Sequence, residues 1–327
     1  MAWSNRRVLV TGAGGFIGSH LVERLTAAGA TTRALVRYTS SGTWGWLDSS
    51  PAKDNVEVLA GDICDREILG RAMRGVDTVF HLAALIGIPY SYDAPASYVR
   101  TNVEGTLAVL QTAIAAGVRR IVHTSTSEVY GSALRVPIDE THPLQTQSPY
   151  AASKASADLM ALSFHRAFGA DVVTVRPFNT YGPRQSARAV IPTIITQALG
   201  GTSIRLGNLS PTRDFTYVRD TVEGFVCAAE ATNVAGRTFN LGTGRDISIG
   251  DLARTIQALL GTDVPVRTDE VRERPASSEV DCLRADASAA RTALGWTPAH
   301  DLHDGLRLTI AWIKDHLERY RIGAYSV

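Results

Sequence analysis

The chain has 327 residues, of which 45% are hydrophobic and 20% charged, and its formal net charge is +1. This composition predicts a folded protein with a substantial core and provides no strong field to attract nucleic acid or anionic lipid. Cys64, Cys227 and Cys282 are too widely spaced for a zinc motif or a disulfide framework, so we expect reduced thiols and no metal site. No apolar run reaches the roughly 20 residues that span a bilayer, which predicts a cytoplasmic protein without membrane contact.

The first motif is a glycine turn between a predicted strand and a predicted helix. Residues 7–11 form a short β-branched run, and apolar residues recur at helical spacing after the turn. The three glycines allow a tight turn, close approach of a pyrophosphate and close packing of the helix, whose N-terminus offers N–H groups to phosphates. The residues of this predicted dinucleotide site are Gly12, Gly15, Phe16, Ile17 and Gly18.

Arg37 follows the second predicted strand, residues 32–36. At this position an acid on the ribose 2′-OH selects NAD, whereas a base on a 2′-phosphate selects NADP. Arginine departs from the acidic pattern, and the hydroxyls of residues 39–41 would help it to hold a phosphate. A solvated surface arginine is an equal alternative, so these residues leave the choice between NAD and NADP open.

Two further strands, residues 78–82 and 120–124, each carry a histidine. His81 and His123 lie among apolar residues without a partner motif beside them. We therefore interpret both as hydrogen-bonded core residues and not as catalysts.

A long helix is predicted over residues 97–116, with Asn102 interrupting its apolar pattern. The polar run 125–131 follows the strand 120–124 directly. Parallel sheets bind ligands at the C-terminal ends of their strands, so this run is a second candidate centre of chemistry.

Tyr150 and Lys154 are four residues apart and therefore lie on one face of a helix, one turn apart. A lysine ammonium beside a phenol stabilises the phenolate and lowers the phenol pKa, which lets the tyrosine accept a hydroxyl proton near neutral pH. Such pairs are common on solvated helices, so the interpretation depends on the other motifs.

Six motifs in one order resemble the extended short-chain dehydrogenase/reductases that act on nucleotide sugars. They are TGAGGFIG (11–18), GDI (61–63), HLAA (81–84), STSEVYG (125–131), YAASK (150–154) and RPFNTYGP (176–183). The resemblance covers nearly the whole chain and implies an α/β fold, with a Rossmann-type doubly wound parallel sheet and a smaller C-terminal α/β substrate lobe. Residues 1–180 would form the NAD(P)-binding domain, joined by later segments at about 215–245, and residues 181–327 would bind the nucleotide sugar.

The resemblance also implies where the cofactor lies. In this family an aspartate accepts a hydrogen bond from the adenine amine and an isoleucine covers the ring, which implies Asp62 and Ile63 here. The cofactor would cross the strand end formed by Leu82, Ala83 and Ala84. The implied cofactor is NAD, and NADP is kept open because Arg37 replaces the usual acid.

The same resemblance makes Thr126, Tyr150 and Lys154 an oxidation triad. Tyr150 would deprotonate the C4 hydroxyl of the sugar, Lys154 would tune the tyrosine and bind the ribose, and Thr126 would hydrogen-bond the same hydroxyl. The triad alone does not decide which reaction follows the oxidation.

Ser127 and Glu128 narrow the reaction. A C4 ketone acidifies the C5 proton, which Glu128 would remove before the C6 hydroxyl is lost. The 4,6-dehydratases usually carry Asp-Glu here, so either Glu128 itself or a Ser127 relay would protonate the leaving hydroxyl. UDP-glucuronate decarboxylases also carry Thr-Ser-Glu, and UDP-sugar 4-epimerases remain a further alternative. A dinucleotide-binding regulator without turnover is disfavoured, because the Tyr-Lys pair is intact and the net charge is small.

Three segments are similar to the nucleotide-GlcNAc 4,6-dehydratases of legionaminic-acid-type pathways: residues 43–46, 84–92 and 182–192. UDP-GlcNAc is therefore the expected substrate, although Trp44 and Trp46 would equally well only pack a loop. The substrate-binding residues implied by resemblance are Asn179, Arg188, Val190, Arg213 and Arg274, with the two last as diphosphate clamps. Asp220 is predicted to cap the helix that follows it. A homodimer is expected by resemblance only.

Overall fold

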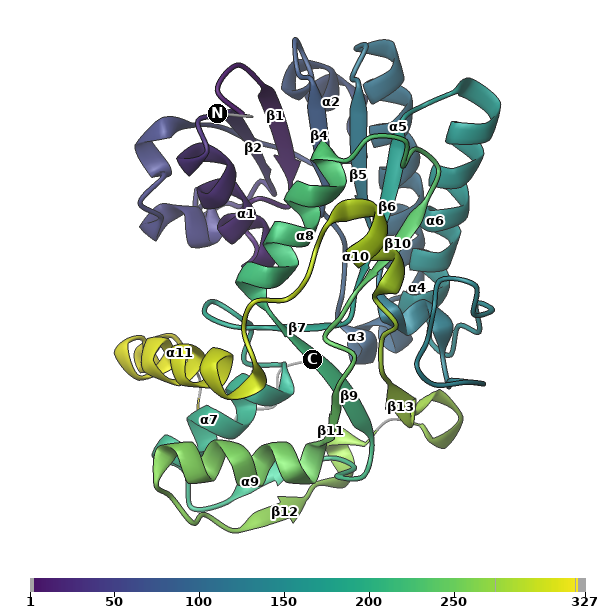
Figure 1. Cartoon of the computed structure of the whole chain (residues 1–327). Coiled ribbons are helices and arrows are strands. Elements are labelled where there is room, and N and C mark those ends of the chain that lie inside the picture. Colours follow the sequence, from purple (N-terminus) through teal and green to yellow (C-terminus); the bar gives the residue numbers. More distant parts are fainter. Residues whose placement is uncertain (1–2, 274, 321, 323–327) are drawn as a thin grey trace.

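The computed structural model describes residues 3–273, 275–320 and 322, and it has two lobes (Figure 1). The larger lobe is a parallel sheet covered by helices on both faces. The smaller lobe contains short strands and three helices beside the C-terminal edge of that sheet. The predicted α/β architecture is therefore confirmed.

Within the described residues, the sheet of the larger lobe has seven strands in the order β3-β2-β1-β4-β5-β6-β10, and every neighbouring pair is parallel. Strand order reverses between β1 and β4, which is where doubly wound sheets bind their ligands. The strands are β1 (Arg7–Thr11), β2 (Thr31–Val36), β3 (Val56–Ala60), β4 (Thr78–His81), β5 (Arg120–Thr124), β6 (Val172–Pro177) and β10 (Thr238–Leu241). The nearly continuous burial of β1, β4 and β6 fits a sheet covered on both faces, while the edge strand β3 is partly exposed.

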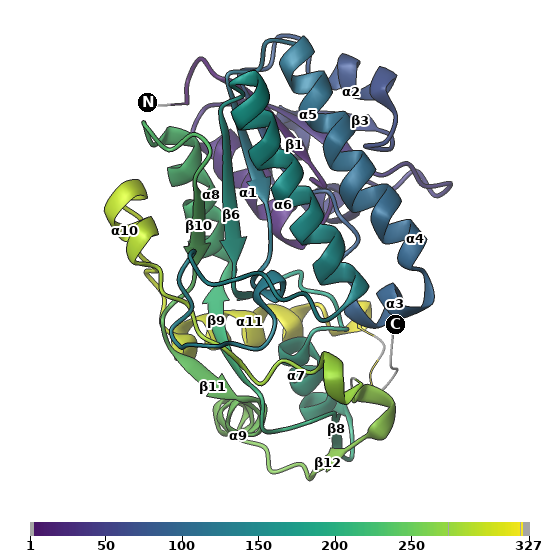
Figure 2. The ribbon, with the colours of Figure 1, turned by 90° about the vertical axis from the view of Figure 1, so that its right-hand side faces the viewer.

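Helices α5 and α6 pack against each other across one face of the sheet, and α2 packs against α5 (Figure 2). On the other face α1 packs against α8, and α8 packs against α10. The edge strand β10 and helix α8 come from late in the chain, so the large lobe is not continuous in sequence. The helices are α1 (Phe16–Ala27), α2 (Arg66–Ala72), α5 (Gly105–Ala115), α6 (Pro149–Phe168), α8 (Val218–Glu230) and α10 (Ser288–Leu294).

The smaller lobe contains a second sheet in which β9 pairs with β7, β11 and β13. A two-stranded pair, β8 with β12, lies beside it. The strands are β7 (Asn179–Tyr181), β8 (Ile204–Leu206), β9 (Thr212–Tyr217), β11 (Asp246–Ser248), β12 (Val266–Thr268) and β13 (Cys282–Leu283). The helices are α7 (Val190–Gly200), α9 (Ile249–Leu260) and α11 (Leu302–Asp315), while the short α3 (Ile88–Asp93) and α4 (Pro95–Tyr98) lie between the lobes.

The helix predicted over residues 97–116 is present as one helical run from Pro95 to Ala115, in which a π-helical segment (Val99–Glu104) around Asn102 joins α4 to α5. One other local prediction is wrong. Asp220 does not cap α8, since the N-cap is Tyr217 and makes no side-chain cap hydrogen bond. The Asp220 carboxylate instead accepts hydrogen bonds from the main-chain N and Nδ1 of His300, at 3.0 and 2.8 Å, and thereby holds the C-terminal segment.

The switch point is held together by Thr11 and Gly12. The hydroxyl of Thr11 accepts hydrogen bonds from the main-chain N–H groups of Leu82 and Ala83, at 3.2 and 3.1 Å. Gly12 has a φ of +69°, and a Cβ at this position would lie 2.8 Å from the nitrogen of Ala83. Only glycine fits this close crossing of two strand ends.

Gly18 makes a second close approach, because a Cβ there would collide with the carbonyl oxygen of Gly12. We expect Gly18→Ala to destabilise the protein by about 1–3 kcal/mol, since main chain must move to make room. Gly70→Ala is the matched control: Gly70 lies on α2 with nothing within 4 Å of the added methyl, and alanine should stabilise that helix by up to about 1 kcal/mol. Urea unfolding of both variants measures the difference, and equal effects would contradict the packing argument.

Candidate active site

The turn Gly12–Gly18 has the features required of a pyrophosphate cradle. Gly15 is the N-cap of α1 and provides no side-chain cap. The N–H groups of the first helical turn are therefore available to an anion at the positive end of the helix dipole. The glycines let the turn close tightly, since a Cβ on Gly12 or Gly18 would meet main chain, and Phe16 and Ile17 begin the helix whose N-terminus would face the anion. The residues present therefore fit a dinucleotide.

The other predicted cofactor residues lie along the same edge of the sheet. Asp62 is exposed after β3 and accepts a hydrogen bond from the main-chain N of Cys64 at 2.8 Å. Ile63 is buried and packs over Gly105. Leu82, Ala83 and Ala84 form the half-buried end of β4, and Arg37 is exposed at the end of β2.

The loop containing Trp44 and Trp46 packs on the glycine turn. The main-chain N of Trp46 donates to the carbonyl oxygen of Gly14 at 3.0 Å, and a Cβ on Gly14 would collide with the carbonyl oxygen of Trp44. The ring of Trp46 meets Trp312 of α11 edge to face, with centroids 5.4 Å apart. Trp46 thus joins the cofactor turn to the smaller lobe by packing.

The triad residues Thr126 and Tyr150 come together at the end of β5. Thr126 is the N-cap of a 3-10 turn (Ser127–Tyr130), and its hydroxyl accepts from the main-chain N of Glu128 at 3.3 Å. Tyr150 lies on the first turn of α6, is 8% exposed, and is close enough to Thr126 and Glu128 for both to affect its pKa. Ser127 is buried beside them.

The pKa of Tyr150 differs from the prediction. Burial raises it above the usual value for a phenol, and the negative charge of Glu128 adds to the rise, while a hydrogen bond with Thr126 opposes it. The direction is thus opposite to the lowering expected from the Tyr-Lys spacing. In this structure the burial of the phenol dominates its pKa, and Lys154 Nζ donates to the carbonyl oxygen of Thr124 at 2.6 Å.

Lys154 is 4% exposed, and burial lowers its pKa to about 8, although the nearby Asp158 opposes this shift. The side chain thus reaches the end of β5 as a cation that loses its proton far more readily than a surface lysine. Its position one turn after Tyr150 agrees with the predicted triad geometry.

Sequence reasoning missed a buried carboxylate behind the triad, Asp158. This side chain accepts hydrogen bonds from Ser125 Oγ at 2.6 Å and from Arg176 Nη2 at 2.9 Å, and it lies 3.1 Å from His123 Nε2. Burial alone would raise the pKa of Asp158, but the hydrogen bond from His123 and the charge of Arg176 outweigh it and hold the pKa at about 2. The signal was present: Asp158 is four residues after Lys154 and so lies on the same face of α6.

The two strand histidines are buried, as predicted. His81 contacts the hydroxyls of Thr11 and Thr106 through its two ring nitrogens, at 2.9 and 3.0 Å. His123 meets Asp158 through Nε2, while its Nδ1 has no hydrogen-bond partner among the described residues. Burial lowers the pKa of both rings.

Tyr98 and Arg188 form a wall beside Tyr150. The rings of Tyr98 and Tyr150 meet edge to face with centroids 6.2 Å apart, and the hydroxyl of Tyr98 donates to the carbonyl oxygen of Gly87. The guanidinium of Arg188 lies against Gly87, since its Nη1 would be 2.9 Å from a Cβ there. Arg188, predicted from sequence, thus lies beside Tyr98, a residue that sequence reasoning missed.

Two residues hold this wall in place. Asn102, which sequence reasoning noted only as an interruption, accepts from the main-chain N of Leu85 at 2.8 Å and donates to its carbonyl oxygen at 3.0 Å. Arg184 adopts a φ of +71° and donates to Ser19 Oγ at 3.1 Å and to Glu23 Oε1 at 2.7 Å. The segment that carries Arg188 is therefore pinned to helix α1.

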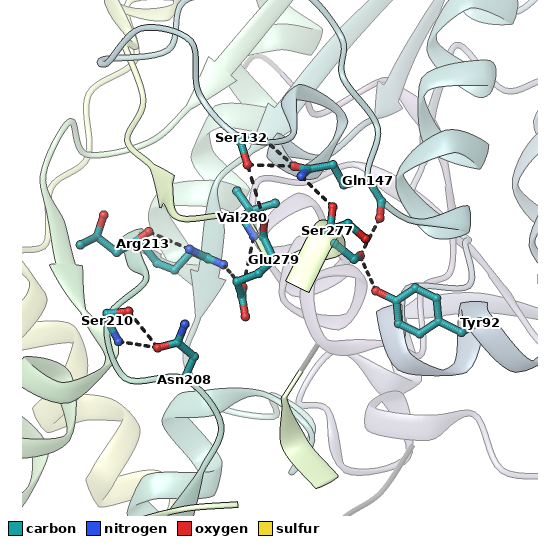
Figure 3. A network of polar contacts seen from close by, with 11 residues as sticks. Tyr92, Ser132, Gln147, Asn208, Ser210, Arg213, Ser277, Glu279 and Val280 are labelled. Carbon is teal, nitrogen blue, oxygen red and sulfur yellow. Dashed lines mark hydrogen bonds and ion pairs between the residues drawn. The ribbon is translucent and has the colours of Figure 1, made fainter. Parts of the chain in front are cut away.

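The predicted diphosphate clamp Arg213 lies on β9 and is 6% exposed. It donates to Glu279 Oε1 at 3.5 Å and to the carbonyl oxygen of Thr212 at 2.9 Å (Figure 3). Asn179 on β7 has a buried Oδ1 without a hydrogen-bond partner among the described residues, which fits an amide that binds a ligand. Val190 begins α7 and is half buried, and Arg274 lies outside the described residues.

Residues 9–309 match the family model described as GDP-mannose 4,6 dehydratase. A dTDP-glucose 4,6-dehydratase of Streptomyces antibioticus is 36% identical over 94% of this chain and 92% of its own length. The chain belongs to the nucleotide-sugar dehydratase and epimerase family of extended short-chain dehydrogenase/reductases. The family predicted from the six motifs is confirmed.

Other members differ in activity. A UDP-glucose 4-epimerase of Mycolicibacterium smegmatis is also 36% identical, over 94% of this chain and 99% of its own length. The crystal structure of DesIV, a dTDP-glucose 4,6-dehydratase of Streptomyces venezuelae with NAD bound, matches with a TM-score of 0.87 and 34% identity, and covers 96% of this chain and 99% of that one.

The described part of the chain contains neither a helix long and apolar enough to cross a membrane nor a cluster of His, Cys, Asp and Glu able to hold a metal ion.

Asp158 makes stability depend on pH in the acid range. Its folded pKa of about 2 is lower than the usual 3.8, so its contribution is fully present above pH 4 and is lost as pH falls through 2. We expect Asp158→Asn to cost roughly 3–5 kcal/mol at pH 6, because Arg176 is left buried without its counter-ion. The variant should also lose less stability than wild type between pH 4 and pH 2.5.

Urea midpoints across this pH range measure both effects. Asp304→Asn is the control, since its pair with Arg307 is exposed and should contribute less than about 0.5 kcal/mol. Equal stability of Asp158→Asn and wild type at pH 6 would contradict a structural role for the buried carboxylate.

Proposed function

We propose that this protein is an NAD-dependent nucleotide-sugar 4,6-dehydratase and that its substrate is UDP-GlcNAc. The observation that carries the proposal is the placement of Glu128 beside Tyr150 and Thr126 at the end of β5. This arrangement puts a second proton acceptor next to the tyrosine that performs the oxidation. The family relatives named dehydratases, and the NAD-bound structure of one of them, support the reaction class and the cofactor.

The residues of the site divide the proton transfers between them. Tyr150 accepts the proton of the C4 hydroxyl, and the Lys154 ammonium favours the resulting phenolate. When bound, NAD would supply an acceptor for the C4 hydrogen and a donor of that hydrogen to C6. The C4 ketone acidifies the C5 proton, which Glu128 removes, and the C6 hydroxyl leaves as water with that proton, delivered by Glu128 directly or through Ser127. After hydrogen is added at C6, the proton that Tyr150 accepted, returned directly or by exchange with solvent, restores the hydrogen at C5.

Plain epimerisation needs only the oxidation triad and rotation of the ketone, so it gives Glu128 no task. A UDP-glucuronate decarboxylase would use the same Thr-Ser-Glu run. Epimerisation is also an alternative, because one relative is a UDP-glucose 4-epimerase. The buried Tyr150 requires a nearby cation to ionise, which Lys154 provides in each of these reactions. All three reactions would use the same triad, so only the product formed can distinguish them.

UDP-GlcNAc is supported by the segments 84–92 and 182–192, which resemble the nucleotide-GlcNAc dehydratases. In the structure these two segments meet, because Arg188 of the second lies against Gly87 of the first, next to Tyr98. One residue of the wall beside Tyr150, Arg188, thus comes from a stretch that carries the resemblance, and the other, Tyr98, lies next to both stretches. The dTDP-glucose and UDP-glucose dehydratases among the relatives make those two substrates the competitors to test.

Incubation of the NAD-loaded protein with UDP-GlcNAc, dTDP-glucose, UDP-glucose and UDP-glucuronate, followed by NMR, tests the function. We expect a 4-keto-6-deoxy product from UDP-GlcNAc, and Tyr150→Phe should lower its rate by about 10³-fold or more because the base is lost. Loss of CO2 from UDP-glucuronate, or a C4 epimer without a methyl group, would replace dehydration by the corresponding alternative. A methyl group formed only from dTDP-glucose or UDP-glucose would correct the substrate.

Glu128→Gln should separate oxidation from elimination. Turnover should fall by about 10²–10⁴-fold, because an amide cannot accept the C5 proton. Addition of substrate should still produce the absorbance of reduced coenzyme, while deuterium exchange at C5 should stop. Glu67→Gln on the exposed first turn of α2 is the control and should behave as wild type. Continued exchange in Glu128→Gln would mean that another residue is the base.

A further inference from the structure

Residues 277–280 form a strap between the lobes, just before β13. The network around it connects Tyr92 of α3, Ser132 and Gln147 of the large lobe, and Arg213 of β9 (Figure 3). Gln147 Nε2 donates to the carbonyl oxygen of Ser277 at 3.1 Å, and Gln147 Oε1 accepts from the main-chain N of Ser132 at 2.6 Å. The strap is therefore attached to the large lobe through side chains and not through a strand.

Ser278 lies at the centre of these contacts and is 6% exposed. Its hydroxyl donates to the main-chain carbonyl oxygen of Gln147 at 2.6 Å and lies 2.6 Å from the hydroxyl of Tyr92. A serine hydroxyl has one proton, and the carbonyl of Gln147 can only accept. The chain of hydrogen bonds therefore runs in one direction, from Tyr92 to Ser278 to Gln147.

Both ends of this chain reach the catalytic tyrosine. Gln147 precedes Ser148, the N-cap of α6, whose hydroxyl accepts from the main-chain N of Ala151 at 3.1 Å. Tyr150 lies on that first turn. Tyr92 packs in the small apolar cluster that contains Tyr98 and Tyr150. The Ser278 hydroxyl thus touches both elements that position the Tyr150 side chain.

The other side of the strap reaches the predicted diphosphate clamp. Glu279 follows Ser278 directly and accepts from Arg213 Nη2 at 3.5 Å. The main-chain N of Thr212 donates to the carbonyl oxygen of Asp281 at 2.8 Å, and β13 continues beside β9 in parallel register. A nucleotide held by Arg213 therefore lies one residue along the strap from the hydroxyl that contacts α6 and α3.

We propose that Ser278 is a positioning residue that couples nucleotide binding at Arg213 to the placement of Tyr150. The proposal rests on the proposed function, because it requires a nucleoside diphosphate at Arg213. When the diphosphate fixes β9 and the strap, the Ser278 hydroxyl fixes the N-terminal turn of α6 against them. Ser278 touches neither substrate nor cofactor in this role and acts through Gln147 and Tyr92.

Hydrogen–deuterium exchange with UDP as the probe tests the coupling. In wild type, saturating UDP should slow exchange of amides 148–155 about tenfold. In Ser278→Ala this protection should fall below about twofold, and kcat should fall about tenfold, the usual weight of one buried hydrogen bond. The Kd for UDP should change less than about threefold, because Arg213 and Glu279 are untouched.

Two further variants separate positioning from a loss of folding. Tyr92→Phe breaks only the α3 arm, so it should lose UDP-induced protection in residues 88–93 and keep it in residues 148–155. Ser163→Ala removes an exposed hydroxyl that bonds within α6, and it should match wild type in protection and kcat. Thermal unfolding of each variant shows that the folded protein is being compared.

Equal UDP-induced protection of residues 148–155 in Ser278→Ala and wild type would overturn the coupling while leaving the proposed function intact. A parallel loss of UDP affinity and kcat in Ser278→Ala would also overturn it, since that pattern means direct binding. Failure of wild type to bind UDP at all would contradict the proposed function, and the coupling with it.

Discussion

The buried carboxylate of Asp158 is the interaction on which the geometry of the site depends. It receives hydrogen bonds from Ser125 after β5 and Arg176 on β6, and it belongs to α6, the helix that carries Tyr150 and Lys154. Removing a buried charge from its partners costs about 3–5 kcal/mol, so this ion pair holds the helix that carries Tyr150 and Lys154 to strands β5 and β6. The same negative charge lies behind the Lys154 ammonium and keeps it from losing its proton more easily still.

Burial disfavours the charged forms of both Tyr150 and Lys154. Burial raises the pKa of Tyr150 and lowers that of Lys154, so both groups are pushed toward their neutral forms. The attraction between a buried phenolate and a buried ammonium is stronger at low dielectric than in water, but each group loses its hydration when it is buried. Asp158 favours the cation, and Thr126 favours the phenolate by hydrogen bonding.

The lobes are joined by several specific side-chain contacts, each at a different part of the site. Trp46 joins the glycine turn to α11, Arg184 joins the segment 182–192 to α1, and Ser278 joins the strap to the residue before the N-cap of α6. Because the substrate would lie between the lobes, the positions of these contacts decide how precisely the reacting atoms are aligned. Small changes of alignment have large effects on rate.

Local patterns in the sequence predicted most of the large lobe and the members of the triad. The glycine turn, the strand ends and the Tyr-Lys spacing are defined by neighbours within a few residues, and such short-range geometry is readable from the chain. The family follows from six such motifs in order. The roles of Asn102, Tyr98 and Ser278 could not be predicted, because each acts on a segment distant in sequence, as Ser278 does on Gln147.

The errors have the same origin. The direction of the Tyr150 pKa was misjudged because spacing reveals a lysine one turn away but not the burial of the phenol or the acceptor that the lysine contacts. The position of Asp220 in the sequence indicated a helix cap, but its carboxylate is hydrogen-bonded to His300, 80 residues later in the chain. The sequence by itself determined the fold class, the glycine turn between the first strand and helix, and which residues are candidates for acid–base chemistry. Only the tertiary structure decided their burial, their partners and their charge balance, because those depend on contacts between segments far apart in the chain.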